Sequence, residues 1–168
     1  RERHILYGAS ITVTRENLER VTASSFVEAL SNQGCGLTLY VEYVPAEEGT
    51  EHLVLEESEL ALLQKNCHAL KRRFRRMIVL SFPGDEEAMG GCLASGRGFF
   101  HINPHGDAEP CPFSPHAGHN LRNTSMAEVL RSRYFEGLRA IAAKAGPHTG
   151  GCVLFQRENE VRALLAAQ

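Results

Sequence analysis

Two of the five cysteines in this 168-residue chain directly follow a Gly-Gly pair, and these are Cys92 and Cys152. A third, Cys111, closes a proline- and glycine-rich segment that begins at Cys92. Glycine lets the backbone approach a metal closely, and backbone N–H groups can then donate to the sulfur atoms. Thiolates suit iron–sulfur clusters or zinc. We therefore predict that Cys92, Cys111 and Cys152 are metal ligands; the alternatives are zinc in place of iron and sulfide, or buried thiols without a metal.

The segment between Cys92 and Cys111 indicates how two remote thiols meet. A short apolar run, residues 98–102, is followed by the turn cluster Asn-Pro-His-Gly-Asp at 103–107. This order is typical of a β-hairpin, which brings its two ends together. Four of the eight histidines also lie within 83–120. We expect loops and a hairpin here, held by a metal more than by a large core.

The elements before this segment alternate between strand and helix patterns. Such a β-α-β-α-β order favours parallel strands joined by crossover helices. Three strands cannot close a barrel, so the expected fold class is α/β, with one half of a partial (β/α) barrel. Its two unpaired sheet edges predict self-association. The expected strands are residues 5–14, 36–44 and 77–82, and the expected helices are residues 16–21, 24–32 and 56–73, with Thr14 capping the first helix.

Helical patterns return after the hairpin. Ser125 is a plausible N-cap, and Glu128 three residues later completes a capping-box sequence. We expect one helix from Ser125 to Lys144 and a last helix from Glu158 to Ala167. The predicted organisation is therefore a half-barrel domain, residues 1–86, followed by a small Cys-ligated domain of a hairpin and helices, residues 87–168.

The order Cys92, thirteen residues, Gly106, four residues, Cys111, with Cys152 as a distal cysteine, resembles a known domain. It is similar to the auxiliary iron–sulfur domain, of SPASM or twitch type, at the C-terminal end of many radical SAM enzymes. Residues 8–14, 41–45 and 79–86 resemble the fourth, fifth and sixth strands of the radical SAM barrel. No Cys-x3-Cys-x2-Cys triplet is present, so the chain looks like the C-terminal part of such an enzyme.

The resemblance implies a set of cofactors and partners. An auxiliary [4Fe-4S] cluster would be held by the three cysteines, and S-adenosylmethionine would be bound by the complete enzyme. Three cysteines leave one iron open to substrate, to a residue outside the chain, or to a histidine. The expected partners are the missing N-terminal half of the barrel and a peptide or small-molecule substrate. The candidate histidines are His101, His105 and His116, although we expect loop histidines to be solvated.

Polar residues at the strand ends are the second group of candidates. Functional groups in barrels of this type sit at the C-terminal ends of strands. The resemblance places Ser10 against the ribose of S-adenosylmethionine, and Thr12 and Glu42 lie on the same expected rim. Ser10 could instead be a strand-end residue that caps the next helix. We expect Asp85 and Glu86, after the third strand, to be exposed loop carboxylates.

Composition and charge bound the remaining possibilities. A net charge of −2 gives no electrostatic argument for nucleic acid or a membrane surface. No apolar run reaches the ~18–20 residues of a membrane span, and no signal peptide is evident. Five cysteines without a secretion signal favour reduced thiols and a cytoplasmic location. The first residues lack a methionine, so we expect that the chain begins within a longer protein.

Three features carry simpler interpretations. Cys35 lies between two glycines that end a helix, and Cys67 lies on an apolar helical stripe, so both are expected to be core residues. The basic run at residues 71–76 is expected to be a solvated helix end, where cations oppose the helix dipole. The alternative function for the whole chain is a zinc-stapled structural or binding module without redox chemistry.

Overall fold

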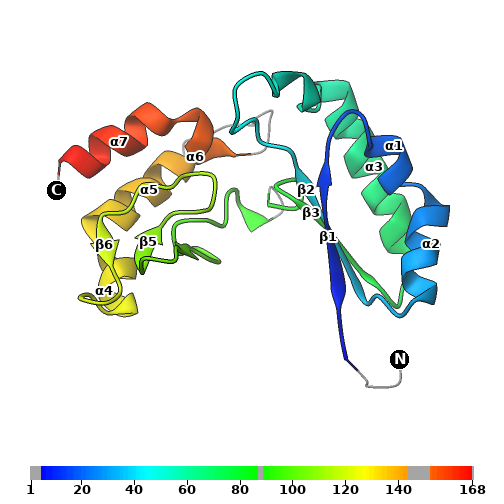
Figure 1. Cartoon of the computed structure of the whole chain (residues 1–168), viewed down its shortest axis with the longest axis horizontal. Coiled ribbons are helices and arrows are strands. Elements are labelled where there is room, and N and C mark those ends of the chain that lie inside the picture. Colours follow the sequence, from blue (N-terminus) through cyan, green and yellow to red (C-terminus); the bar gives the residue numbers. More distant parts are fainter. Residues whose placement is uncertain (1–4, 87–88, 144–151, 168) are drawn as a thin grey trace. The chain divides into compact units, whose positions relative to one another are not determined.

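The computed structural model describes residues 5–86, 89–143 and 152–167 (Figure 1). It divides into two compact units, and the main division falls after Asp85. The first unit is Arg1–Asp85 with Thr149–Gly151, and the second is Glu86–His148 with Cys152–Gln168. The sequence places this boundary one residue later, between residues 86 and 87.

The first unit is built on a three-stranded parallel sheet in the order β1-β2-β3. Helices connect consecutive strands, which confirms the predicted β-α-β-α-β order. Each observed strand is shorter than the predicted stretch, and the described residues form no closed barrel. The elements are β1 (Gly8–Val13), α1 (Leu18–Val21), α2 (Ser24–Asn32), β2 (Leu37–Glu42), the 3-10 turn η1 (Glu51–Leu53), α3 (Glu57–Arg73) and β3 (Ile78–Phe82).

Helix α3 begins one residue after its predicted start. It has a capping box that was not predicted, in which the side chains of Glu56 and Glu59 each accept a backbone N–H of the other residue. The predicted cap of α1 by the Thr14 hydroxyl is wrong. Asn17 is the N-cap residue, and its Oδ1 accepts the Thr14 N–H at 3.0 Å. The amide side chain folds back on the preceding turn, as is typical of Asn at such positions.

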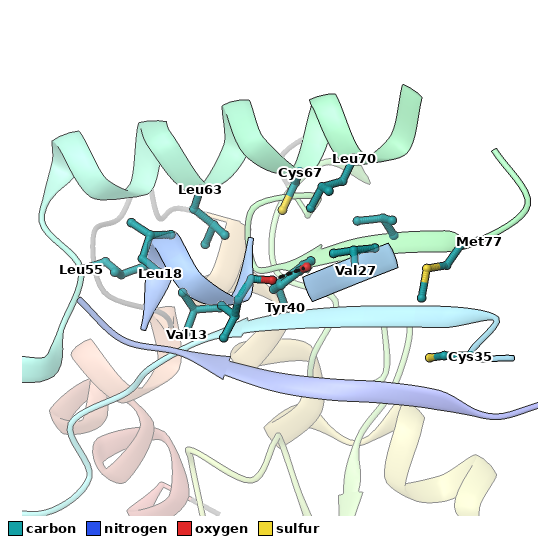
Figure 2. Close-up of a cluster of buried hydrophobic side chains, with 12 residues drawn as sticks. Val13, Leu18, Val27, Cys35, Tyr40, Leu55, Leu63, Cys67, Leu70 and Met77 are labelled. Carbon is teal, nitrogen blue, oxygen red and sulfur yellow. Dashed lines mark hydrogen bonds between the residues drawn. The ribbon is translucent and has the colours of Figure 1, made fainter. Parts of the chain in front are cut away.

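One face of the sheet carries the hydrophobic core of the first unit. Helices α1, α2 and α3 all lie on this side of the sheet (Figure 1). Tyr40 is fully buried, and its hydroxyl donates to the Val21 carbonyl at 2.9 Å (Figure 2). Leu63 and Cys67 of α3 point toward the sheet in the same cluster (Figure 2). Cys35 and Cys67 are both buried here, which matches the expected core role.

The opposite face of the sheet is not covered by helices of the first unit (Figure 1). Register places Leu39 of β2 opposite Leu80 of β3, on the face away from the core. Ile78 and Leu80 are 58% and 36% exposed, although both are large and apolar. A parallel sheet is normally covered on both faces, so this face is unusual for a finished α/β domain.

The second unit combines a small antiparallel sheet with helices. The predicted hairpin is confirmed by β4 (His101–Ile102) and β5 (Asp107–Glu109), which pair antiparallel. Gly106 adopts φ +89° in the turn between them, a conformation that favours glycine. A third strand, β6 (His119–Asn120), pairs with β5 and was not expected. Two residues are too few to carry a period-two pattern.

The prediction of one continuous helix from Ser125 to Lys144 is wrong. It is two helices, α4 (Met126–Arg131) and α5 (Arg133–Ala143), and Lys144 lies outside the described residues. The break is at Ser132, whose backbone is extended and whose Oγ accepts the Phe135 N–H at 3.2 Å. A serine at this position caps a new helix better than it continues an old one. The predicted capping box of Ser125 and Glu128 is confirmed.

Two further helices follow, α6 (Val153–Gln156) and α7 (Glu158–Ala166). The buried residues of α5 include Tyr134, Phe135 and Leu138, and α5 packs against α4, α6 and α7. Phe100 packs edge-on against Phe135, with ring centroids 5.8 Å apart, and so ties the β4 strand region to the helices. Among the described helices, none has the length and apolar character needed to cross a membrane.

Truncating Leu63 tests the one-sided core of the first unit. Leu63 is fully buried between α3 and the sheet, so Leu63→Ala should lower the free energy of unfolding by about 2–5 kcal/mol. Ile78→Ala removes a comparable side chain from the uncovered face and should change it by about 0.5 kcal/mol or less. Urea unfolding followed by circular dichroism measures both, and equal effects would contradict the assignment of a single covered face.

Candidate metal centre

The three cysteines predicted as ligands all lie in the second unit, and each is buried. The Sγ atoms of Cys111 and Cys152 are 3.8 Å apart, although 41 positions separate them in sequence. Cys92 lies close enough to interact electrostatically with both other thiols. The fold therefore brings together three thiols that are remote along the chain.

Cys92 is positioned by the turn that precedes it. Gly90 and Gly91 have φ values of +81° and +98°, which side chains with a Cβ rarely adopt. The Arg97 guanidinium fixes this turn by donating to the carbonyl oxygens of Met89, Gly90 and Cys92 at 3.0, 3.1 and 2.8 Å. The Gly-Gly pair thus allows a turn that points the Cys92 thiol inward.

Cys111 is positioned by the return strand of the hairpin. The Ser95 N–H donates to the Pro110 carbonyl at 3.2 Å, which ties the segment after Cys92 to the residue before Cys111. The Ser114 N–H then donates to the Cys111 carbonyl at 3.0 Å and closes a turn. The hairpin therefore does what the sequence predicts, because it brings the regions of Cys92 and Cys111 together.

Cys152 stands at the start of α6, next to the buried residues Val153 and Leu154. These apolar side chains anchor the short helix in the second unit, and the Cys152 carbonyl accepts the Gln156 N–H at 3.1 Å. The Gly-Gly pair before Cys152 lies outside the described residues. The position of the thiol therefore follows from the packing of α6.

Each thiol accepts a hydrogen bond from a backbone N–H two residues further along the chain. Successive N–H groups that point at one atom form a concavity that stabilises an anion, as they do around many iron–sulfur sites. Cys152 accepts a second such bond, from the backbone N–H three residues further along the chain. At each of the three turns, backbone N–H groups therefore favour the thiolate form of the cysteine. The donors are Ala94 for Cys92, Phe113 for Cys111, and Leu154 and Phe155 for Cys152.

Burial and the contact between Cys111 and Cys152 shift the pKa values of the three thiols in different directions. Burial raises the pKa of Cys92 to about 11. The hydrogen bond to Cys152, followed by burial, raises the pKa of Cys111 above its usual range. The same bond lowers the pKa of Cys152, and the backbone N–H groups of Leu154 and Phe155 lower it further. Cys152 is therefore the first of the three to ionise, with the Cys111 S–H donating to it.

The sulfur pair fits a metal site in two respects. Two thiolates on one tetrahedral ion, each about 2.3 Å from it, stand about 3.8 Å apart. The observed separation of 3.8 Å matches this geometry and is far longer than a disulfide bond. In addition, the buried hydroxyls of Ser95 and Ser114, each three residues after a candidate ligand, have no hydrogen-bond partner within the described residues. Such hydroxyls can donate to ligand or cluster sulfur atoms.

The site is not fully assembled. In residues 5–86, 89–143 and 152–167, no three His, Cys, Asp or Glu side chains form a ready coordination shell. The Cys111–Cys152 pair is close, and metal binding would have to draw Cys92 toward it.

Glu86 is the residue that sequence reasoning missed. It was expected to be an exposed loop carboxylate, but it is only 4% exposed. Its Oε1 accepts the Leu93 N–H at 2.6 Å, directly after Cys92. Burial raises the pKa of Glu86, and the carboxylate interacts electrostatically with Cys92 and Cys152. Asp85, the other expected loop carboxylate, is partly exposed and pairs with Lys71 at 2.7 Å.

The strand-end candidates in the first unit lie on two different faces. Ser10 and Thr12 are exposed on the uncovered face, where register sets them beside Leu39 and Val41. Glu42 is 7% exposed and alternates onto the opposite face, which carries the helices. The structure therefore keeps Ser10 and Thr12 together and does not bring Glu42 to them.

Two of the candidate histidines make side-chain contacts that were not expected. His101 Nδ1 lies 2.8 Å from the Glu109 carboxylate, and His116 Nε2 lies 3.2 Å from Glu158. Glu109 also accepts from Asn103 at 2.7 Å, so a polar network holds the hairpin. The side chain of His116 is only 15% exposed, which corrects the expectation of a solvated loop histidine. His105 is exposed, as expected.

Comparison with known proteins gives no family for this chain. No family model matches it, and searches of curated proteins and of solved structures found no match.

Metal uptake should release protons and depend steeply on pH. The thiols of Cys92 and Cys111 have raised pKa values and are protonated near neutrality, whereas bound cysteine is a thiolate. Zinc binding should therefore release at least about two protons and weaken at least about a hundredfold per unit fall in pH. Competition with a chromophoric chelator measures this affinity, with Cys67→Ser as a control outside the site. An affinity that does not change with pH would contradict the prediction.

Proposed function

We propose that this chain is the C-terminal portion of a radical SAM enzyme. Its second unit would hold an auxiliary [4Fe-4S] cluster, and its first unit would supply half of the barrel that binds S-adenosylmethionine and substrate. The observation that carries the proposal is the convergence of three buried thiols, each accepting backbone N–H groups.

The first unit supports the proposal through its uncovered sheet face. In a (β/α) barrel, helices cover the outside of the sheet and the other face lines the interior. Here the helices cover one face, and Ser10 and Thr12 lie on the other beside apolar residues. Those two hydroxyls would contact the ribose and substrate once the N-terminal strands complete the barrel. Glu42, on the helix-covered side, would act only as a rim residue.

The residues around the thiols have definable roles toward such a cluster. When bound, it would supply an anchoring point for substrate or accept an electron. Cys92, Cys111 and Cys152 would hold it, and the backbone N–H groups two residues after each would donate to the sulfur atoms. Burial of all three cysteines would exclude water from the centre. The Cys-x3-Cys-x2-Cys triplet that initiates the family's chemistry is absent, so this chain alone would not be catalytic.

A specific observation favours a second candidate, a zinc-stapled structural or binding module. The Cys111–Cys152 separation of 3.8 Å is that of two thiolates on a single metal atom. A four-iron cluster takes one thiolate on each iron, so its thiolates stand further apart and this pair would have to open. Zinc would need no such change and would staple the hairpin to α6 without redox chemistry.

Anaerobic reconstitution with iron and sulfide distinguishes the two candidates. The wild-type chain should gain a broad charge-transfer absorption with stoichiometric iron and acid-labile sulfide. The variant with Cys92, Cys111 and Cys152 all changed to Ser should lack this absorption, whereas the Cys35→Ser, Cys67→Ser control should keep it. Identical spectra from the wild type and the triple variant would refute the cluster. Stoichiometric zinc in the purified protein, with no sulfide, would favour the zinc module.

The uncovered sheet face should also make the isolated chain self-associate. Leu80 lies in the apolar part of this face, so Leu80→Lys should shift the protein toward the monomer. Ala61→Lys adds the same charge at an exposed position of α3 and should leave association unchanged. Light scattering coupled to gel filtration measures the mass. A wild-type chain that stays monomeric at all concentrations would count against an open half-barrel.

A further inference from the structure

Cys111 and Cys152 are two buried thiols that lie against each other. Their Sγ atoms are 3.8 Å apart, and the residues are 3% and 6% exposed. An S–S bond is about 2.05 Å long, so the two sulfur atoms need to approach by about 1.8 Å to form one. Modest rotations of the two side chains supply a movement of this size. The pair is therefore placed for a covalent link as well as for a shared metal.

The backbone on either side of this contact is well supported. Cys111 forms a β-bridge with Ser114, whose N–H donates to the Cys111 carbonyl at 3.0 Å. The Cys152 carbonyl accepts the Gln156 N–H at 3.1 Å, and the fully buried Leu154 anchors the same turn. Two packed segments, 41 positions apart in sequence, thus create the contact between the sulfur atoms. Burial also keeps a thiol of a second chain away from either sulfur.

We propose that Cys111 and Cys152 form a reversible intrachain disulfide when the metal-free protein meets a peroxide. The proposal rests on the contact between the two sulfur atoms and holds with or without the metal site. Only its consequence for metal binding rests on the proposed function, because a disulfide sulfur is no longer a thiolate ligand. Oxidation would then empty the centre, and reduction would restore its ligands.

The reaction balances with hydrogen peroxide as the oxidant. One of the two sulfurs, as the thiolate, attacks a peroxide oxygen, so that an S–O bond forms, the O–O bond breaks and hydroxide leaves. The other sulfur, also as the thiolate, attacks the first one. An S–S bond then forms, the S–O bond breaks and a second hydroxide leaves. The two thiol protons convert both hydroxides to water, and the peroxide gains the two electrons that the sulfurs lose.

The contact between the sulfurs also decides where the oxidation stops. A sulfenic acid without a neighbouring thiol is oxidised further to sulfinic acid, which thiols do not reduce. Here the second sulfur lies 3.8 Å from the first and converts the sulfenic acid to a disulfide. The link would join the return of the hairpin to the start of α6, the two segments that a metal would otherwise hold. Oxidation would therefore keep these segments together in the absence of a metal.

Peptide mapping of the wild-type chain tests the pairing. The chelator-treated protein is exposed to hydrogen peroxide, its free thiols are alkylated in denaturant, and it is cut with trypsin without reduction. Cys92, Cys111 and Cys152 fall in separate tryptic peptides, residues 77–97, 98–122 and 145–157. The last two peptides should be recovered as one linked species, with the loss of two of the five thiols. Dithiothreitol should return all five.

Cys92 is the internal control, because it lies in the same unit and is 7% exposed, close to the value for Cys152. Its peptide should stay unlinked and alkylated, and Cys92→Ser should still form the Cys111–Cys152 link. A disulfide between Cys92 and either partner, a link between two chains, or full alkylation of Cys111 and Cys152 after peroxide would overturn the proposal. The wild-type map decides this by itself, so the result does not depend on the folding of a variant.

Zinc affinity separates the disulfide from the metal site. The oxidised chain should bind zinc at least about a hundredfold more weakly than the reduced chain, because two of the three thiolates are lost, and dithiothreitol should restore binding. Equal affinity of the two forms would overturn the effect of oxidation on the centre. A reduced chain that forms the link but binds no zinc would refute the metal site and support the disulfide. Zinc binding without any link would do the reverse.

Discussion

The second unit depends on the burial of sulfur atoms that would be thiolates in any metal-bound form. Cys111 and Cys152 lie 3.8 Å apart in an environment without bulk water, and each is met by backbone N–H groups. Those donors are available only because three separate turns have their particular shapes. Three segments therefore position the thiols jointly: the turn of Gly90 and Gly91, the hairpin, and the start of α6. The strands of this unit have only two or three residues, and its buried core lies mainly on the helices, in residues such as Tyr134, Phe135 and Leu138.

The first unit is constrained by a different imbalance, between its two sheet faces. On the helix-covered face of the sheet, Tyr40, Leu63 and the other core residues form a buried apolar cluster. The other face carries Leu39 and Leu80 beside the hydroxyls of Ser10 and Thr12. A solvated face is normal for antiparallel sheets and unusual for parallel ones. On this face the hydroxyls of β1 lie in the same rows as apolar residues of β2 and β3, because Ser10, Leu39 and Leu80 are register partners.

Local signals in the sequence predicted most of the fold. Apolar runs gave the three strands, and the serine and glutamate of the capping box gave the start of α4. The failures needed information from elsewhere in the chain. Ser132 breaks a helical pattern through its own cap, and β6 exists only because β5 offers a partner. The approach of Cys92 to Cys111 was predicted from the hairpin and that of Cys152 from the resemblance. The burial of Glu86 was not predicted, because a carboxylate after a strand carries no sign of its surroundings.

Charge and geometry bear differently on the identity of the metal. Three thiolates around a zinc ion would leave about one excess negative charge, and a four-iron cluster with the same ligands would leave a similar excess. The N–H donors and Arg97 would compensate either centre equally well, so charge does not choose between them. The Cys111–Cys152 distance is the one observation that favours the zinc candidate, because the pair has the spacing of ligands on one atom. A four-iron cluster would have to separate that pair, and the free hydroxyls of Ser95 and Ser114 would then gain sulfur acceptors.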